Sequence, residues 1–300
     1  MTAHLPLIAD IANPQLTQAL QHKLDHKTKP LGSLGRLEQL ALRLGQIQGT
    51  ASPDLQQPQM VVFAGDHGLA ARGVSAFPSD VTWQMVENFL AGGAAVSVLA
   101  RQHGLALTVV DCGVARDIAP RAAVPGQPQL LVRKVAAGTQ DASIGPAMTP
   151  AQCAQALHNG MDVVRGLPGN ALLLGEMGIG NTSVASLLLA RLCGVSLEDC
   201  TGAGTGLDAG GVARKRAVLA QALAANEGAV NPLDALAALG GFEVATLVGA
   251  VLQASSERRV IVVDGFITSA AVLVAARLQP HVLQRCVFAH GSAEPGHAHM

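Results

Sequence analysis

Short aliphatic segments recur along this chain, and each ends at a glycine or a polar residue before a helical pattern begins. A repeating order of strand, loop and helix predicts a parallel sheet whose strands are joined by right-handed helical crossovers. Six segments have the length and composition of buried strands: residues 60–64, 105–111, 129–135, 170–176, 259–264 and 285–290. We therefore expect an α/β fold with a parallel sheet of about six strands and helices on both faces.

The composition agrees with such a core. Apolar residues make up 49% of the 300 residues, and the chain has no Tyr, one Trp and six Phe, so its interior must be built mainly from Ala, Val and Leu. The net charge of −1 provides no basic field for a polyphosphate backbone, and we expect no nucleic-acid partner.

Helix boundaries are marked by capping signals. Thr149 precedes Pro150 and lies three residues before Gln152, which predicts a helix start with proline at its first position. The other expected helices cover residues 79–103, 181–193, 211–225 and 268–278, whereas residues 120–150 are expected to be irregular around one strand.

The first 58 residues have a different character. They are typical of helices joined by the turn TKPLGSLG at residues 28–35, and they predict a small helical domain at 1–58 beside a large α/β nucleotide-binding domain at 59–300. Five scattered cysteines without a C-x-x-C pair favour neither a disulfide framework nor a zinc site. No apolar stretch approaches the roughly 18 residues that span a bilayer, and no secretory signal is present, so a cytoplasmic location without membrane contact is expected.

Polar residues follow the predicted strands where their carboxyl ends should meet, and that is where open parallel sheets bind ligands. The segment GEMGIGNTS at 175–183 is the most informative, because it combines Glu176 with Gly178 and Gly180, whose backbone amides could donate hydrogen bonds to a phosphate. A tight turn with a helix cap would explain Gly180 and Asn181, but it would not require the carboxylate of Glu176.

A second glycine run at 201–211 includes Gly204 and leads into a basic helical stretch. It fails as a dinucleotide fingerprint, because no strand leads into it and no acidic strand end follows about 20 residues later. Lys215 is the basic residue here that we expect to meet a phosphate or a developing charge. A flexible turn followed by a solvated basic helix face is the alternative.

Asp264 and Gly265 lie at a strand end, where one carboxylate could bind ribose hydroxyls. The paired acids that magnesium pyrophosphate chemistry uses are missing here. The alternative role for Asp264 is to cap the helix that follows. The spacing of His290, His297 and His299 fits no common zinc pattern, so no metal is expected. Asp66 and His67 could form a dyad, but a hydrogen-bonded structural histidine is the more ordinary interpretation.

Phe77, Pro78 and Gln84 could hold a flat heteroaromatic ring with one polar contact. Their neighbours Val81, Met85 and Phe89 recur at helical spacing, which predicts core packing instead.

Taken together, these motifs resemble the nicotinate-nucleotide:dimethylbenzimidazole phosphoribosyltransferases, which make the lower-ligand nucleoside phosphate of cobalamin. The resemblance covers nearly the whole chain and runs in order through residues 24–41, 63–101, 175–183, 202–215, 239–243, 263–267 and 290–297. It implies a Rossmann-like large domain, a small domain built from both termini, and a homodimer with active sites near the subunit interface.

The implied reaction is attack by a benzimidazole ring nitrogen on C1′ of nicotinate mononucleotide, with inversion to the α-nucleotide and release of nicotinate. No cofactor is expected, because the pyridinium leaving group departs neutral and the protein needs only to orient the reactants, anchor the phosphate and remove one proton.

The resemblance also assigns roles to residues. Glu176 would lie beside the reacting centre, and Lys215 would pair with the phosphate. The remaining positions would cradle the phosphate (Gly178, Gly180, Gly204 and Ser292), face the sugar (Glu243 and Asp264) or hold the benzimidazole (Phe77, Pro78 and Gln84).

One difference from the family concerns catalysis. In the family a glycine-flanked glutamate beyond the segment that corresponds to residues 290–297 acts as general base, whereas this sequence ends at His299 and Met300. We expect the 300-residue chain to be weakly active or inactive unless Glu176 substitutes for that glutamate. A non-catalytic nucleotide-binding homologue and a phosphoribosyl-pyrophosphate-dependent transferase are the alternative hypotheses, and the sequence does not decide which acceptor base is preferred.

Overall fold

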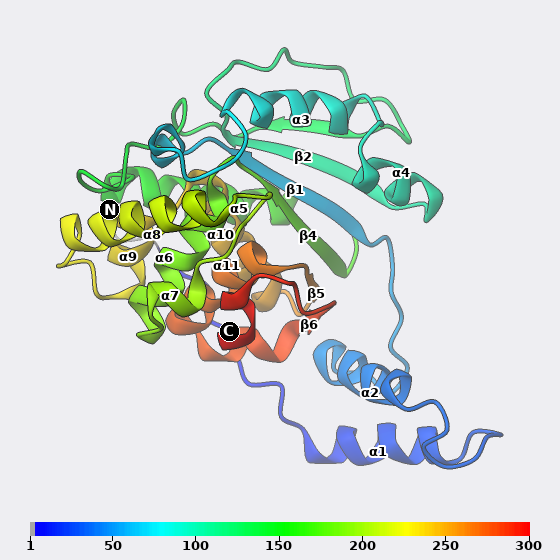
Figure 1. The fold of residues 1–300 in the computed structure, drawn as a ribbon. Helices are drawn as coiled ribbons and strands as arrows, with labels where there is room; N and C mark the ends of the chain where they lie inside the picture. Colours follow the sequence, from blue (N-terminus) through cyan, green and yellow to red (C-terminus); the bar gives the residue numbers. More distant parts are fainter. Residues whose placement is uncertain (1–3) are drawn as a thin grey trace.

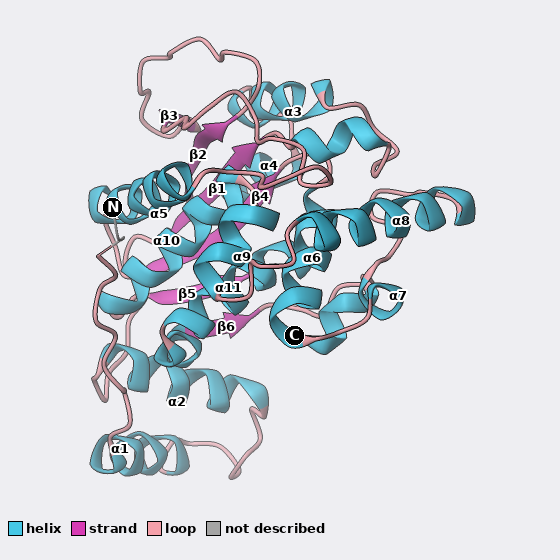
Figure 2. Ribbon diagram, turned by 90° about the vertical axis from the view of Figure 1, so that its left-hand side faces the viewer, coloured by secondary structure: helices cyan, strands magenta, loops and turns pink. Residues whose placement is uncertain are grey.

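The computed structural model describes residues 4–300, and its centre is a sheet of six parallel strands in the order β3-β2-β1-β4-β5-β6 (Figures 1 and 2). The strands are β1 (Gln59–Gly65), β2 (Ala106–Gly113), β3 (Gln129–Val132), β4 (Ala171–Met177), β5 (Val260–Val263) and β6 (Cys286–Phe288). From β1 the chain adds β2 and β3 on one side of the sheet, and then β4, β5 and β6 on the other side. This is the Rossmann order, and its ligand crevice opens at the carboxyl ends of β1 and β4, where the direction of winding reverses.

All six predicted strands are therefore confirmed, but β5 is shorter than predicted by one residue at each end, and the two edge strands are shorter still. β3 ends at Val132 instead of residue 135, and β6 covers Cys286–Phe288 instead of residues 285–290. An edge strand pairs with one neighbour only, so fewer of its residues are held in extended geometry.

Helices cover both faces of the sheet (Figure 1). On one face α10 packs against four strands and against α5, with α11 beside it, and on the other face α3 and α4 pack against β1 and β2. The helices are α1 (Pro14–Asp25), α2 (Arg36–Gln48), α3 (Asp80–Leu90), α4 (Ala95–Gln102), α5 (Pro150–Gly166), α6 (Asn181–Cys193), α7 (Leu197–Cys200), α8 (Ala209–Ala225), α9 (Pro232–Leu239), α10 (Phe242–Ser256) and α11 (Phe266–Leu278).

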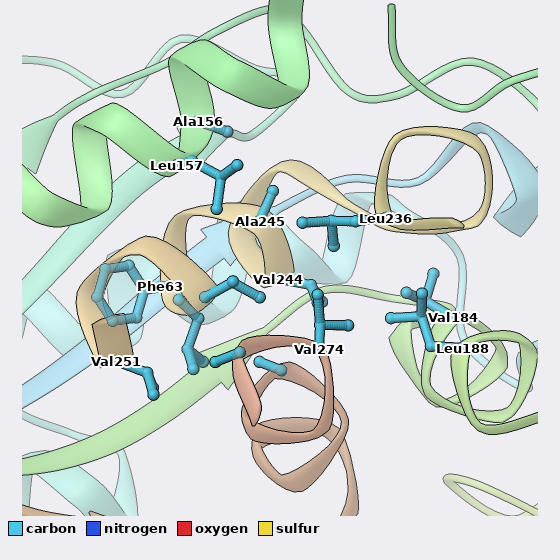
Figure 3. Close-up of a cluster of buried hydrophobic side chains, with 14 of the residues drawn as sticks. Phe63, Ala156, Leu157, Val184, Leu188, Leu236, Val244, Ala245, Val251 and Val274 are labelled. Atoms are coloured by element: carbon cyan, nitrogen blue, oxygen red, sulfur yellow. The ribbon is translucent and has the colours of Figure 1, made fainter. Parts of the chain in front are cut away.

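Alternation along β1 explains how one strand serves both layers. Val61 and Phe63 belong to the core beneath α10, whereas Val62 and Ala64 belong to the core beneath α3. Figure 3 shows part of the larger core, where side chains from β1, α5, α6, α9, α10 and α11 meet without a polar atom among them.

Several predicted helices are confirmed. α6 has the predicted bounds, and α5 begins with a complete capping box in which Thr149 and Gln152 bond each other's backbone amides. The single helix predicted for residues 79–103 is wrong, because α3 ends at Leu90 and α4 starts at Ala95. Gly92 between them adopts φ of 80°, which a continuous helix does not allow.

The N-terminal helices α1 and α2 pack against each other beside β5 (Figure 1). Ile47 of α2 is buried with Ala171 and Val260, and the Arg258 guanidinium donates to the Ile47 carbonyl at 2.8 Å. The division into domains at 1–58 and 59–300 stays a prediction. None of the described helices has the length and apolar character needed to cross a membrane.

Candidate active site

Several of the expected site residues lie at the carboxyl edge of the sheet. Glu176 is the penultimate residue of β4 and pairs in register with Phe63 of β1, so it lies at the ligand crevice. It shares the strand face of Leu172 and Leu174, which contribute to the core on the α10 side.

The Glu176 carboxyl is held by a neighbouring side chain. The Asn181 amide donates a hydrogen bond to it from the first turn of α6. Burial, together with the nearby carboxylates of Glu243 and Asp264, raises the pKa of Glu176 to about 7. A carboxyl with this pKa exchanges a proton near neutral pH, as a general base or acid must.

The expected cap of α6 is not formed. The N-cap is Gly180, whose φ is 97°, and no side chain caps it. Asn181 bonds Glu176 instead, and the Thr182 hydroxyl accepts a hydrogen bond from Lys215. Asn181, which was expected to cap the helix, and its neighbour Thr182 therefore bond the two charged groups of the site.

Lys215 lies in α8, which begins after the Asp208 N-cap, and its side chain is fully buried. Its Nζ is 2.9 Å from the Thr182 Oγ1, and Gly204 is close enough that an added Cβ would lie 3.5 Å from the same nitrogen. Burial lowers the pKa of Lys215 to about 8. The alternative of a solvated basic face is therefore wrong for this residue, although its neighbour Arg214 is exposed.

Asp264 follows β5 and is largely exposed. It does not cap α11, whose N-cap is Gly265; its carboxylate instead lies 2.7 Å from the His290 Nε2. The pair therefore stands at the open rim of the site, where ribose hydroxyls could replace the ring as partners of Asp264.

Ser292 lies in the loop after β6, which a histidine holds in place. The Ser292 amide donates to the His297 Nδ1 at 2.8 Å, so the His297 Nε2 carries the proton toward the Ser269 hydroxyl, 3.1 Å away. Among residues 4–300, no group of three or more His, Cys, Asp and Glu side chains is arranged to hold a metal ion.

Glu243 lies in the first turn of α10 and is fully buried. Its Oε1 is 2.8 Å from the His67 Nε2, so the interpretation of His67 as a hydrogen-bonded group is confirmed. The assignment of Glu243 to the sugar stays a prediction, because in the structure its partner is this histidine.

An apolar pocket of about 400 Å³ opens beside Glu176 and Asp264. α3 contributes Met85 and Phe89, and the sheet contributes Val62 and Val262. The pocket can hold a flat apolar ring beside the strand ends that carry Glu176 and Asp264.

The residues expected to hold a ring do not line this pocket. Phe77, Pro78 and Gln84 are exposed, on the loop before α3 and on its outer face, and their role stays a prediction. Met85 and Phe89, which the helical spacing assigned to the core, do pack in the core beneath α3, and they line the pocket as well. Their spacing could have indicated a helix face that reaches a site, but it does not distinguish a core from a pocket wall.

Comparisons with known proteins point to one family. A family model described as "Phosphoribosyltransferase" matches residues 10–300. The nicotinate-nucleotide–dimethylbenzimidazole phosphoribosyltransferase of Variovorax paradoxus (strain S110) is 71% identical over 294 residues, which cover 98% of this chain and 82% of that protein. The protein of the same name from Dechloromonas aromatica (strain RCB) is 55% identical, over 96% of this chain and 82% of its own length.

A solved structure gives the same result. The crystal structure of the nicotinate-nucleotide–dimethylbenzimidazole phosphoribosyltransferase of Thermus thermophilus superimposes with a TM-score of 0.87 at 38% identity, over 96% of this chain and 85% of that one. The fold, the arrangement of the site and these relatives lead to one conclusion: the chain belongs to the nicotinate-nucleotide:dimethylbenzimidazole phosphoribosyltransferase family.

Proposed function

We propose that this protein transfers the 5-phosphoribosyl group of nicotinate mononucleotide to 5,6-dimethylbenzimidazole, giving α-ribazole 5′-phosphate and nicotinate. The observation that carries the proposal is the placement of a buried lysine, a carboxyl with a pKa near neutrality and an apolar pocket around one edge of the sheet. Such a set provides one partner each for the phosphate, the reacting centre and the acceptor ring.

The phosphate would bind at Lys215. The ammonium already donates to Thr182, and phosphate oxygens would give its remaining protons acceptors in a buried setting, where charge-assisted hydrogen bonds are strong. The amides of Gly178, Gly180 and Gly204, together with Ser292, would complete the cradle at the start of α6.

The sugar and the acceptor would occupy the remaining space. Asp264 and Gly265 at the rim would meet the ribose hydroxyls, and the benzimidazole would enter the pocket lined by Met85 and Phe89. This arrangement would bring C1′ and the acceptor nitrogen together with Glu176 beside the acceptor ring, which is the proximity that the displacement requires.

In the reaction the bond between C1′ and the pyridinium nitrogen breaks, and its electron pair leaves with nicotinate. A benzimidazole nitrogen forms the new bond on the opposite face of C1′, and the proton on the other ring nitrogen is lost. We propose that Glu176 accepts this proton, and that its charge stabilises the oxocarbenium-like centre as the old bond breaks.

The rate at which this 300-residue polypeptide performs the reaction is separate from the reaction's identity. The match covers 82% of the length of each of the two relatives described above, and the expectation that this polypeptide is weakly active stays a prediction. The cytoplasmic location expected from the cysteines also stays a prediction.

The proposed function is tested by incubating the protein with nicotinate mononucleotide and dimethylbenzimidazole in the presence of a chelator. The nucleotide formed is then identified by mass and by the anomeric NMR signal. The proposal predicts the α-nucleotide and one equivalent of nicotinate without added magnesium. Product that appears only with phosphoribosyl pyrophosphate and magnesium, or binding of nicotinate mononucleotide without any product, would refute it.

A further inference from the structure

Behind the reacting carboxyl lies a buried ion pair that the proposed reaction does not use. His67 follows β1 and Glu243 begins α10, 176 positions apart in the chain, and their side chains are 1% and 0% exposed. A buried charge is costly unless it is paired. Each of the two groups therefore lowers the free-energy cost of burying the other.

The backbone closes tightly on this pair. An added Cβ on Gly178 would lie 2.9 Å from the His67 Nε2, and one on Gly241 would lie 2.3 Å from the Cε1 of the same ring. Gly178 follows Glu176 by two residues. The His67 ring therefore lies directly against the turn that follows the reacting carboxyl.

The cluster is also incompletely hydrogen-bonded. Among the described residues, the His67 Nδ1, the Glu243 Oε2 and the Asp66 Oδ1 are buried without a partner. Buried polar atoms are nearly always satisfied in folded proteins, and three exceptions in one cluster point to a requirement other than stability.

Three charged groups face Glu176 from different elements. They are Glu243 from α10, Asp264 from the loop after β5 and His67 from the end of β1; Asn181 of α6 adds a neutral donor. After burial, Glu243 and Asp264 raise the pKa of Glu176, whereas His67 lowers it. Burial opposes protonation of His67, but Glu243, Asp66 and Glu176 outweigh it and raise the pKa of His67 above its ordinary value.

We propose that His67 and Glu243 are positioning residues for Glu176. The pair fixes the loop after β4 against α10, and it holds two opposite charges beside the reacting carboxyl. The proposal rests on the function proposed above, because it assigns the pair to the proton transfer that Glu176 performs.

The test uses H67Q and E243Q in the full chain, with kcat, KM and the pH dependence of kcat/KM as readouts. Removing the negative charge in E243Q is expected to move the acid-side midpoint to lower pH by about one unit or more. Removing the positive charge in H67Q is expected to move it to higher pH. The KM for nicotinate mononucleotide should change less than kcat, because the Lys215 cradle is untouched.

Opposite shifts separate this role from a purely structural one. A pair that only stabilises the fold would lower the fraction of active protein in both variants and leave the midpoint of the remainder unchanged. E257Q is the matched control, because Glu257 forms an ion pair with Arg259 at the far end of α10, and its midpoint should equal that of the wild type.

If either single variant fails to fold, the double variant H67Q/E243Q is measured, because it leaves no buried charge without its partner. Its kcat is expected below that of the wild type, because the turn after β4 loses its contact with the charged pair. Full wild-type kcat in the double variant would overturn the proposal.

A readout without turnover distinguishes this proposal from the proposed function. The titration of Glu176, followed by ¹³C NMR of labelled carboxyl groups, should show the same two shifts in opposite directions. A wild type that makes no nucleotide refutes the function, and unshifted or parallel Glu176 titrations refute the positioning role.

Discussion

At the scale of single residues, the carboxyl of Glu176 and the amine of Lys215 are bonded by the adjacent residues Asn181 and Thr182 of α6, and burial moves their pKa values toward neutrality from opposite sides. Between the two values, at about pH 7 to 8, the carboxyl is largely ionised while the amine keeps much of its charge. This is the combination that a proton acceptor and a phosphate anchor need at the same time.

The first prediction concerns Glu176. A base must be ionised to accept a proton, so kcat/KM of the wild type should fall as the pH drops through about 7. E176Q should lower kcat by about 10²- to 10⁴-fold and remove this dependence. The measurement is steady-state turnover across pH, and E198Q, which changes an exposed glutamate of α7, is the control. Wild-type turnover by E176Q would contradict the assignment.

The second prediction concerns Lys215. Because its pKa is lowered to about 8, it loses its charge above that pH, and kcat/KM for nicotinate mononucleotide should decline there. K215M should lower kcat/KM by about 10- to 100-fold, the equivalent of one hydrogen bond to a charged group. R214M changes the adjacent exposed arginine and should behave as the wild type. Equal losses in both variants would mean that general basicity, and not a phosphate cradle, matters here.

The chemistry of these two residues could be predicted from the sequence, because a carboxylate and a lysine beside glycine runs have few structural explanations. Their partners could not. Asn181 and Thr182 resemble a helix cap in one dimension, and only the approach of β4 and α8 gives them other partners. The contact between His67 and Glu243 joins residues 176 positions apart, a separation at which local patterns carry no information.

At the scale of elements, α10 organises the molecule. It packs on four strands and on α5, and every residue from Phe242 to Ser255 is buried. This helix was not predicted, because an element that is apolar on all sides shows no helical periodicity. Strands were easier to predict, since short aliphatic runs that end in glycine or acid have few other interpretations.

The third prediction follows from the contact between α5 and α10. An added Cβ on Gly249 would lie 1.9 Å from the Leu157 carbonyl oxygen, and one on Gly160 would lie 1.8 Å from the Thr246 carbonyl oxygen. G249A should therefore force the helices apart and lower the free energy of unfolding by about 1–3 kcal/mol, as overpacked cores do. Urea unfolding followed by circular dichroism measures the change.

The control for this prediction is on the same helix pair. Gly166 ends α5, and an added Cβ there meets no atom within 4 Å, so G166A should leave the unfolding midpoint unchanged or raise it slightly. If G249A were as stable as G166A, the close contact between the two helices would not exist in solution.

At the scale of the whole molecule, strand order is what brings the site together. The six strands could have been arranged in several ways, and no property of the separate segments selects β3-β2-β1-β4-β5-β6. Once β1 and β4 are neighbours, the segments that follow β1, β4 and β5 converge on one edge, as expected for an open parallel sheet. The class of fold was therefore predictable, whereas the pocket beneath α3 was not.

The fourth prediction concerns assembly. The family resemblance implies a homodimer, and we expect a mass in solution twice that of the 30.6 kDa chain. Light scattering coupled to size exclusion measures this mass directly, and dilution across a wide concentration range shows whether the dimer dissociates. A mass of one chain at every concentration would contradict the expectation.

The measurement that tests the account most directly is a crystal structure of the protein with nicotinate mononucleotide bound. The account predicts one ligand at the carboxyl ends of β1, β4 and β5, with its phosphate on Lys215 and Thr182, its ribose at Asp264 and its C1′ beside Glu176. A nucleotide bound at any other place, or one whose phosphate lies away from Lys215, would contradict it.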